Sequence, residues 1–326
     1  MLGTPTPPTT LRDATVATAV AAGGGVADHV ARRHLPGRLP ARVSVIVPLR
    51  DAAGYVERQL RALQVQHCPC PVELLVVDNG SVDGGPERVR TLGAALGLPL
   101  TLLRTGRAAG INVARNHGVA HASGELLVFC DADDEVDPGW LAALVAAAPT
   151  AHLLGGALDE VRLNESLRWQ RPPMPSGAAP TALGFLPFAP GANLAVWADV
   201  VAELGGFDER FRAGNCDVEL SFRAQLAGYR LAHVPDAVVA YRHRPSAGGL
   251  FSQFRAYGRA EPLLWASYRD AGLRRDPPLR VARRWAGLAL GPLQLRSAAA
   301  GGRWLATAGF SLGRVEGSIA RRRLFL

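Results

Sequence analysis

Short apolar runs that end abruptly in polar or acidic residues recur along the first half of the chain. They cover residues 43–47, 72–77, 100–103 and 124–130. Continuous apolar runs of this length are typical of strands buried on both faces of a parallel sheet. Between the first two runs, the segment 55–63 places Val56, Leu60 and Leu63 on one helical face. The alternation of strands and helices predicts βαβ units with right-handed crossovers, and hence an α/β fold.

The last of these strands is followed directly by Asp131-Ala132-Asp133-Asp134. Open α/β sheets bind ligands at the carboxyl ends of their strands, and the i, i+2 spacing lets two carboxylates converge on one hard cation. Proteins hold Mg²⁺ by one or two carboxylates together with substrate phosphate oxygens. The motif therefore predicts a Mg²⁺ or Mn²⁺ site that binds a diphosphate. Taken by itself, it is more typical of an acidic, solvated turn before a helix that begins near Pro138, and the accompanying motifs favour the metal site.

Two further polar segments belong to the same predicted sheet edge. The turn 78–84, which begins with Asp78, has the residues needed for positive φ and for local side-chain hydrogen bonds. It fits a contact to a nucleotide base or ribose, and it also fits an ordinary Asx-type turn. Arg115 lies in a segment, 110–118, that resembles the opening of a helix. Its planar guanidinium suits a phosphate or a base, but it also fits an exposed helical arginine.

In chain order, these segments resemble the catalytic domain of family 2 glycosyltransferases, which have the GT-A fold. The resemblance rests on VSVIVP, VELLVVDNGSVDG, GINVARNHGVAHASGELLVFCDADDEVDPGWL, GANLAV, LGGFDERF and CDVELSFRAQLAGYRL, which together span about residues 43–245. It implies a GT-A-type, mostly parallel nucleotide-binding sheet flanked by helices. It also implies a metal-dependent, hexosyltransferase-type enzyme that moves a sugar, with inversion, from a nucleotide-diphosphate donor to an acceptor hydroxyl.

The resemblance assigns roles to individual residues of this chain. Asp217 falls where the family places its general base. Asp78 resembles the aspartate that hydrogen-bonds the nucleotide base, and Pro48 belongs to the first loop, which packs on that base. Arg115 lies in the A-R-N signature that lines the nucleotide pocket. The glycine of the segment 190–193 is expected at the acceptor mouth, where the absence of a side chain allows close backbone approach.

The metal site is implied in the same way. Asp133 resembles the direct metal ligand of the D-x-D pair, and Asp131 the aspartate nearer the ribose. His243 stands where relatives often carry a histidine that completes the metal shell or contacts the diphosphate. A lone histidine is more often structural, and the neighbouring Arg242 and Arg244 are alternative contacts for the diphosphate.

One departure from the family pattern concerns the predicted base. The family commonly has Glu-Asp where this chain has Cys216-Asp217. We expect the loss of the first carboxylate to change the acceptor site more than to abolish catalysis. The alternative is a catalytically silent nucleotide-sugar-binding or scaffold protein. A sugar-phosphate nucleotidyltransferase is disfavoured, because residues 48–51 read Pro-Leu-Arg-Asp instead of a glycine-rich basic loop.

The partners implied by the resemblance are a UDP-, GDP- or dTDP-linked sugar and a glycan or lipid-linked acceptor of the cell envelope.

The composition of successive segments predicts the domain boundaries and the cellular compartment. Residues 1–42 are rich in Ala, Thr, Pro and Gly without a signal-peptide layout, and are expected to form a flexible leader. The GT-A domain covers 43–245, and a basic helical extension covers 246–326. Within the domain, the Pro- and Gly-rich segment 171–190 predicts a loop over the acceptor site. Four cysteines without a paired metal-binding pattern fit a reducing cytoplasm and exclude a zinc site.

The positive charge is concentrated in the tail. The chain has a net charge of +8 and no lysine, and residues 271–326 hold eleven arginines against Asp276 and Glu316. Interspersed Trp and Leu make residues 272–326 suitable for an amphipathic helix on an anionic membrane surface, which would place the protein at the inner face of the cell membrane. A helical subdomain packed on the catalytic domain fits equally well. No nucleic-acid-binding motif is present, and no apolar run is long enough to span a bilayer.

Overall fold

The computed structural model describes residues 33–106, 110–167, 171–175, 177–291 and 297–326. Its central sheet contains eight strands: β1 (Val43–Leu49), β2 (Val72–Asp78), β3 (Leu100–Arg104), β4 (Leu126–Cys130), β5 (Glu135–Val136), β6 (Leu153–Asp159), β9 (Asn193–Trp197) and β10 (Leu231–Ala240). A separate two-stranded ribbon consists of β7 (Thr181–Ala182) and β8 (Leu186–Pro187). All four strands predicted from apolar runs are confirmed as β1 to β4.

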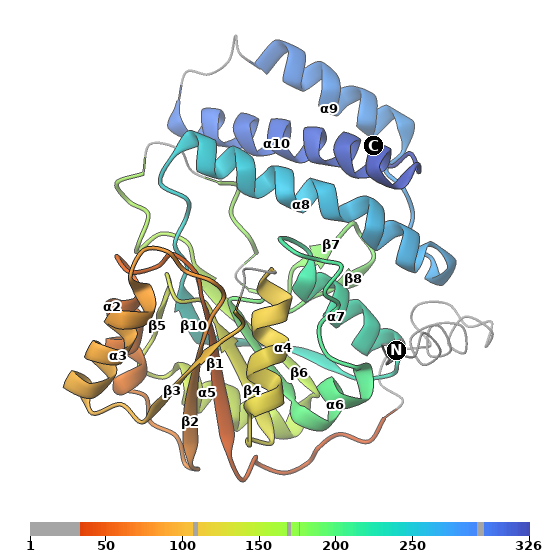
Figure 1. Ribbon diagram of the computed structural model, residues 1–326. Coiled ribbons are helices and arrows are strands. Elements are labelled where there is room, and N and C mark those ends of the chain that lie inside the picture. Colours follow the sequence, from red (N-terminus) through yellow and green to blue (C-terminus); the bar gives the residue numbers. More distant parts are fainter. Residues whose placement is uncertain (1–32, 107–109, 168–170, 176, 292–296) are drawn as a thin grey trace, which may run out of the picture.

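Helices surround the sheet and extend beyond it at one end (Figure 1). The α-helices in the described residues are α2 (Val56–Gln64), α3 (Gly85–Leu96), α4 (Ile111–His121), α5 (Trp140–Ala147), α6 (Ala198–Leu204), α7 (Cys216–Leu226), α8 (Ala247–Tyr268), α9 (Pro278–Leu290) and α10 (Ala298–Arg321). Two short 3₁₀ segments, Ala148–Thr150 and Arg269–Ala271, follow α5 and α8. Helix α4 packs against β1 and β2, and α5 packs against β10.

The sheet is mostly parallel, as predicted, with one antiparallel strand inserted near its middle. The strand order is β3-β2-β1-β4-β9-β6-β10-β5. The pairs β1–β2, β1–β4, β2–β3 and β6–β10 are parallel, whereas β9 runs antiparallel to both β4 and β6, and the short edge strand β5 runs antiparallel to β10. Because Asn193 pairs with Cys130, the beginning of β9 lies beside the carboxyl end of β4. The loop before β9 is thereby brought next to the acidic motif that follows β4.

Close packing of α4 on the sheet depends on a glycine. Gly118 faces β1, and a Cβ there would lie only 2.5 Å from Cγ2 of Ile46. Real Cβ atoms do not approach other atoms so closely, so any side chain at this position would push the helix away from the sheet. The short distance lets Arg115, one turn earlier on the same helix, reach the carboxyl edge of the strands.

The C-terminal helices form a compact layer above the sheet in Figure 1, with α8 and α10 side by side. Gly309, Gly313 and Gly317 lie one helical turn apart on α10, and a Cβ at each would overlap a backbone carbonyl oxygen of α8. The two helix backbones are therefore in direct contact. A buried ion pair between Arg314 of α10 and Glu261 of α8 adds a charged link across the same interface.

A second group of ion pairs ties α9 to this layer. Asp276, in the connection between α8 and α9, accepts hydrogen bonds from Arg314 at 2.7 Å and from Arg284 of α9 at 2.9 Å. The tail is thus a packed helical unit, although α9 itself contributes no buried residue. Among the helices of the described segments, none combines the length and the apolarity that a bilayer crossing needs.

Two predicted loop regions are partly fixed in the structure. Residues 33–42, the end of the predicted leader, are bound to the domain: Arg33 pairs with Glu203 and lies over the ring of Tyr229. Residues 1–32 lie outside the described residues. The predicted loop 171–190 contains the β7–β8 ribbon, and within it Arg171 is buried with its Nε 3.2 Å from Oε1 of Glu160.

Candidate functional site

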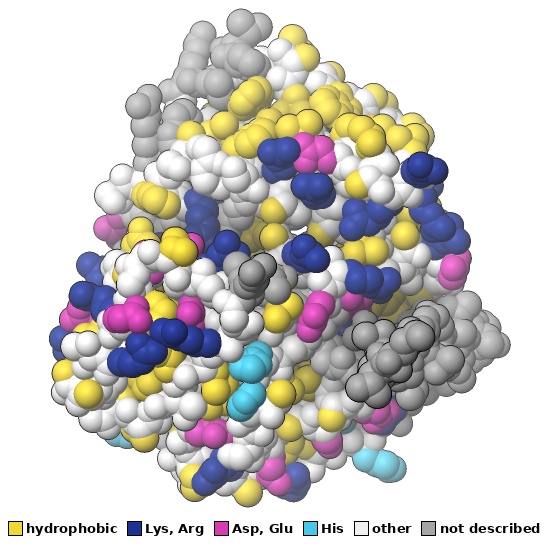
Figure 2. Space-filling view, in the orientation of Figure 1, with side chains coloured by type: hydrophobic (Ala, Val, Ile, Leu, Met, Phe, Trp, Pro, Cys, Tyr) yellow, Lys and Arg dark blue, Asp and Glu magenta, His cyan; other side chains and the backbone are white. Residues whose placement is uncertain are grey.

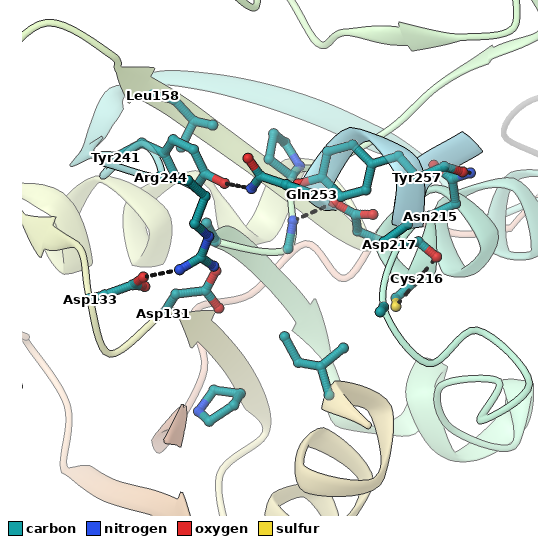
Figure 3. A pocket seen from close by; sticks show the side chains of 18 of the residues that line it. Asp131, Asp133, Leu158, Asn215, Cys216, Asp217, Tyr241, Arg244, Gln253 and Tyr257 are labelled. Carbon is teal, nitrogen blue, oxygen red and sulfur yellow. Dashed lines mark hydrogen bonds and ion pairs between the residues drawn. The ribbon is translucent and has the colours of Figure 1, made fainter. Parts of the chain in front are cut away.

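A cavity of about 890 Å³ lies between the carboxyl edge of the sheet, the first turn of α7 and one face of α8. Five of the seven site residues predicted from the sequence line it, and Figure 3 shows three of them, Asp131, Asp133 and Asp217, with their neighbours. The five are Pro48, Arg115, Asp131, Asp133 and Asp217. The other two, Asp78 and His243, are not part of the cavity lining.

The three carboxylates of the acidic motif after β4 form a cluster at the end of that strand. The side chains of Asp131, Asp133 and Asp134 each offer an oxygen, and these atoms all lie within 4.8 Å of one another. Burial, with repulsion from Asp133, raises the pKa of Asp131 to about 6 and that of Asp134 well above its ordinary range. Buried like charges are costly unless a positive charge compensates them.

The donor set in this cluster suits a hard divalent cation. Asp134 is buried; its Oδ1 accepts the backbone N–H of Arg242 at 2.7 Å, while its Oδ2 has no hydrogen-bond partner among the described residues. Carboxylate oxygens are the ligands that Mg²⁺ and Mn²⁺ prefer. An unpaired buried carboxylate oxygen next to two further carboxylates therefore fits the binding of such an ion.

The segment after β10 sends an arginine, and not the predicted histidine, to this cluster. Nη1 of Arg244 lies 3.2 Å from Oδ2 of Asp133 (Figure 3). The His243 ring is buried on the other side, with its Nε2 3.4 Å from Oε1 of Glu160. Of the four residues 241–244, Tyr241 and Arg244 line the cavity, whereas Arg242 and His243 do not. Arg242 donates from its Nε to the backbone carbonyl of Asp133.

One residue, Gly191, connects the predicted base with the arginine of the A-R-N segment. The N–H of Gly191 donates to Oδ2 of Asp217 at 2.8 Å, and the carbonyl of Gly191 accepts from Nη2 of Arg115 at 3.0 Å. The same Nη2 lies 3.8 Å from Oδ1 of Asp131. Gly191 is thus a physical link between the acidic cluster and α7. A Cβ at this position would lie 2.5 Å from Nη2 of Arg115, which explains why the loop needs a glycine here.

Asp217 and Cys216 begin α7 and point in different directions. Oδ1 of Asp217 accepts the backbone N–H of Val218 at 2.9 Å, so both carboxylate oxygens are oriented by backbone donors. The Cys216 thiol is buried and donates to the carbonyl of Phe211, and burial raises its pKa to about 11. Neighbouring positions on a helix differ by about 100° in direction. The cysteine is therefore a neutral, buried residue that lines the cavity beside the Asp217 carboxylate.

The predicted nucleotide turn lies next to the cavity. Oδ1 of Asp78 accepts the backbone N–H of Ser81 at 2.9 Å, the hydrogen bond of an Asx-type turn. Its Oδ2 lies 3.9 Å from Nε of Arg104. The following residue, Asn79, lines the cavity together with Pro48. A base contact by Asp78 stays a prediction.

Helix α8 supplies a wall of the cavity that the sequence did not predict. Ser252, Gln253 and Tyr257 face it, and Nε2 of Gln253 donates to the hydroxyl of Tyr241 at 3.2 Å (Figure 3). Tyr257 also packs over the backbone of Gly214, in the loop before α7. These residues belong to the helical extension. Their part in the site depends on how the extension folds back, for which no local sequence signal exists.

Comparison with known proteins identifies relatives of the chain. A family model described as "Glycosyl transferase family 2" matches residues 44–198. "Glycosyltransferase AglE" from Haloferax volcanii is 31% identical over 227 residues, which cover 68% of this chain and 74% of AglE. The "N-acetylglucosaminyl-diphospho-decaprenol L-rhamnosyltransferase" of Mycobacterium tuberculosis is 28% identical over 273 residues, covering 72% of this chain and 86% of that protein. Some other curated relatives are longer, and the match covers about half of their length, 47%.

Solved structures show the same fold. The mannosyltransferase PcManGT from Pyrobaculum calidifontis, in complex with GDP-Man and Mn²⁺, superposes with a TM-score of 0.54 at 23% sequence identity. The superposition covers 93% of this chain and 97% of PcManGT. At this identity the likeness establishes the architecture, and it confirms the predicted GT-A fold class.

Proposed function

The chain belongs to glycosyltransferase family 2 and is a glycosyltransferase, and from this premise we propose that it transfers a sugar, with inversion, from a nucleotide-diphosphate donor to an acceptor hydroxyl. The observation that carries the proposal is the common cavity. Asp131 and Asp133, at the end of β4, face the same space as Asp217 of α7, and Arg115 lies between them. This arrangement supports a diphosphate site at the acidic cluster and a general base at Asp217, on opposite sides of one reaction space.

In this proposal Asp217 takes the proton of the attacking acceptor hydroxyl. Its two oxygens accept N–H groups from Gly191 and Val218, which leave further lone pairs for the proton. A base held in this way contributes typically ~10²–10⁴-fold to the rate. Direct attack by the acceptor forms the new glycosidic bond as the bond to the diphosphate breaks, which inverts the anomeric carbon.

The opposite side of the cavity holds the leaving diphosphate. Asp131, Asp133 and Asp134 would hold Mg²⁺ or Mn²⁺, which supplies a Lewis acid for the negative charge on the departing oxygen. Arg244 is half exposed and already pairs with Asp133, so its guanidinium is available to phosphate oxygens at the same place. We assign it the diphosphate contact predicted for His243.

For the donor and the acceptor we propose only the chemical class. PcManGT binds GDP-Man and Mn²⁺, which supports a nucleotide-sugar donor with a divalent ion, and the choice among UDP, GDP and dTDP is left to experiment. The name of the rhamnosyltransferase relative states a diphospho-decaprenol acceptor, which supports a lipid-linked or cell-envelope glycan here. Such an acceptor places the reaction in the cytoplasm at the inner face of the cell membrane.

The test is thermal unfolding of the protein with UDP, GDP and dTDP, each with and without Mn²⁺. Binding to the folded state raises the melting temperature by mass action. We expect a shift with one nucleotide that requires the ion and is lost in Asp133→Ala. Asp217→Asn should keep that shift and lose turnover, whereas a nucleotide-binding scaffold would be unaffected in its function. No shift with any nucleotide would refute the proposal.

A further inference from the structure

Helix α9 is anchored to the rest of the protein along one side only. On that side Arg284 bonds Asp276, and the carbonyl of Leu288 accepts from Nε1 of Trp304 at 3.1 Å. None of its thirteen residues is buried. A helix of a folded domain normally buries an apolar stripe against its neighbours, so the distribution of side chains on the outer side of α9 is informative.

The outer side of α9 is apolar. Leu279, Ala282, Ala286 and Leu290 follow the i, i+3, i+7, i+11 spacing of one helical face, and all four are exposed. The side chains of Leu279 and Leu290 are 62% and 58% exposed, and Trp285 on the flank is 41% exposed. Figure 2 shows hydrophobic side chains gathered along the upper edge of the molecule, where α9 and α10 lie. We call this surface the α9 face.

Exposed arginines surround the α9 face. They precede α9, lie on it and follow it on α10: Arg274, Arg275, Arg280, Arg283 and Arg303. In the described parts of residues 274–305 the only acidic residue is Asp276, whose side chain is 14% exposed and pairs with Arg284, Arg314 and the rim residue Arg280. The face therefore has an apolar centre and a strongly cationic rim.

We propose that the α9 face docks on an anionic lipid bilayer. Amphipathic helices with apolar and aromatic residues beside arginines lie in the interface plane, where the apolar face enters the acyl boundary and the cations meet lipid phosphates. A second copy of the chain is a poorer occupant, because two-fold pairing places the same arginine rim on both sides of the contact. The packing of α10 shows that only part of the basic tail serves this surface, since Arg314 and Arg284 are engaged in internal ion pairs.

The position of the face gives it a role in the proposed reaction. Helix α8 packs along α10 and at the same time lines the catalytic cavity. A bilayer bound at α9 is thus connected to the acceptor side of the cavity through one rigid helical layer. This link to a lipid-bound acceptor rests on the proposed function, whereas the docking itself does not.

The experiment measures binding of the purified full-length protein to vesicles. Vesicles of phosphatidylcholine alone are compared with vesicles that contain about 30% phosphatidylglycerol, at about 0.1 M salt. We expect binding only to the anionic vesicles. The double variant Leu279→Asp, Leu290→Asp should lower the bound-to-free ratio about tenfold or more, since both side chains leave the apolar interface. Val161→Asp, at a 66% exposed valine in the sheet domain, is the matched control and should bind as the wild type does.

Three results would overturn the docking. No binding to anionic vesicles, or equal binding by the double variant, would exclude the α9 face as the lipid contact. A wild-type dimer in light scattering that the double variant converts to monomer would assign the face to a second copy. The nucleotide-induced thermal shift is measured on the same preparations. If no nucleotide shifts the melting temperature while vesicle binding is intact, the proposed transferase is refuted and the docking still stands.

Discussion

Substitution of Gly191 by alanine probes the connection between the two sides of the cavity. The backbone at Gly191 does not have the positive φ that excludes side chains, so alanine is allowed by the local conformation. The obstacle is Arg115: an added Cβ would lie 2.5 Å from its Nη2 and 3.0 Å from its Cζ. Ordinary van der Waals contacts of such atoms begin near 3.5 Å, so either the guanidinium or the peptide must move by about 1 Å.

The effect of this movement on the reaction rate follows from the two hydrogen bonds that Gly191 makes. The Gly191 N–H orients Asp217, and its carbonyl holds Arg115 beside Asp131. A displacement of about 1 Å in a group that positions the reacting atoms can cost about 10²-fold in rate, equivalent to about 2.7 kcal/mol of transition-state stabilisation. The free energy of unfolding should fall much less, by about 1 kcal/mol for one weakened hydrogen bond.

The assay compares kcat and KM for sugar transfer with the unfolding midpoint of the same variant. Gly139→Ala is the control, because a Cβ at that glycine meets no atom within 4 Å. We expect kcat to fall about 10²-fold in Gly191→Ala and to stay near the wild-type value in the control. A kcat within about twofold of the wild type would show that the Arg115–Gly191–Asp217 link does not position the base.

Two further predictions concern charged groups that hold the helices. Burial acts to raise the pKa of Asp276, but hydrogen bonds from Arg314 and Arg284 outweigh it and hold that pKa below its ordinary value. Its stabilising effect is therefore present above about pH 4 and is lost as the pH falls through the lowered pKa, so the difference in Tm between wild type and Asp276→Asn should shrink in acid. Arg223→Met leaves Glu219 buried without its charged partner and removes the donor to the carbonyls of Leu204 and Gly206, which should lower the free energy of unfolding in urea by about 3–5 kcal/mol. The addition of Glu219→Leu should recover much of that loss, and failure to do so would contradict the ion-pair explanation.

The sequence by itself determined the sheet and its acidic edge. Residues 43–47 and 124–130 could be predicted as strands because a short, almost wholly apolar run is typical of a strand buried on both faces, and the structure has β1 and β4 there. The same reasoning located Asp131 and Asp133, since a polar residue directly after such a strand must lie at the edge of the sheet. Ordered motifs of a known family then supplied the predicted base, Asp217, which no periodicity reveals.

Tertiary structure decided which neighbouring side chain faces the cavity. Arg244 and His243 are adjacent in the sequence, and only the path of the chain after β10 places the arginine at Asp133 and the histidine at Glu160. Likewise, the antiparallel insertion of β9 brings Gly191 between Arg115 and Asp217. Contacts between residues far apart in the chain depend on strand order and register, which local patterns do not encode.

The basic tail shows most clearly what the sequence determines and what only the tertiary structure determines. Its composition determined that an amphipathic, arginine-rich helix would form, and it fitted membrane contact and domain packing equally well. The structure separates the two: glycines let α10 pack directly on α8, while α9 keeps its apolar face exposed. An apolar stripe has the same pattern whether a helix or a bilayer covers it. Only the tertiary arrangement shows which stripes the protein itself has already covered.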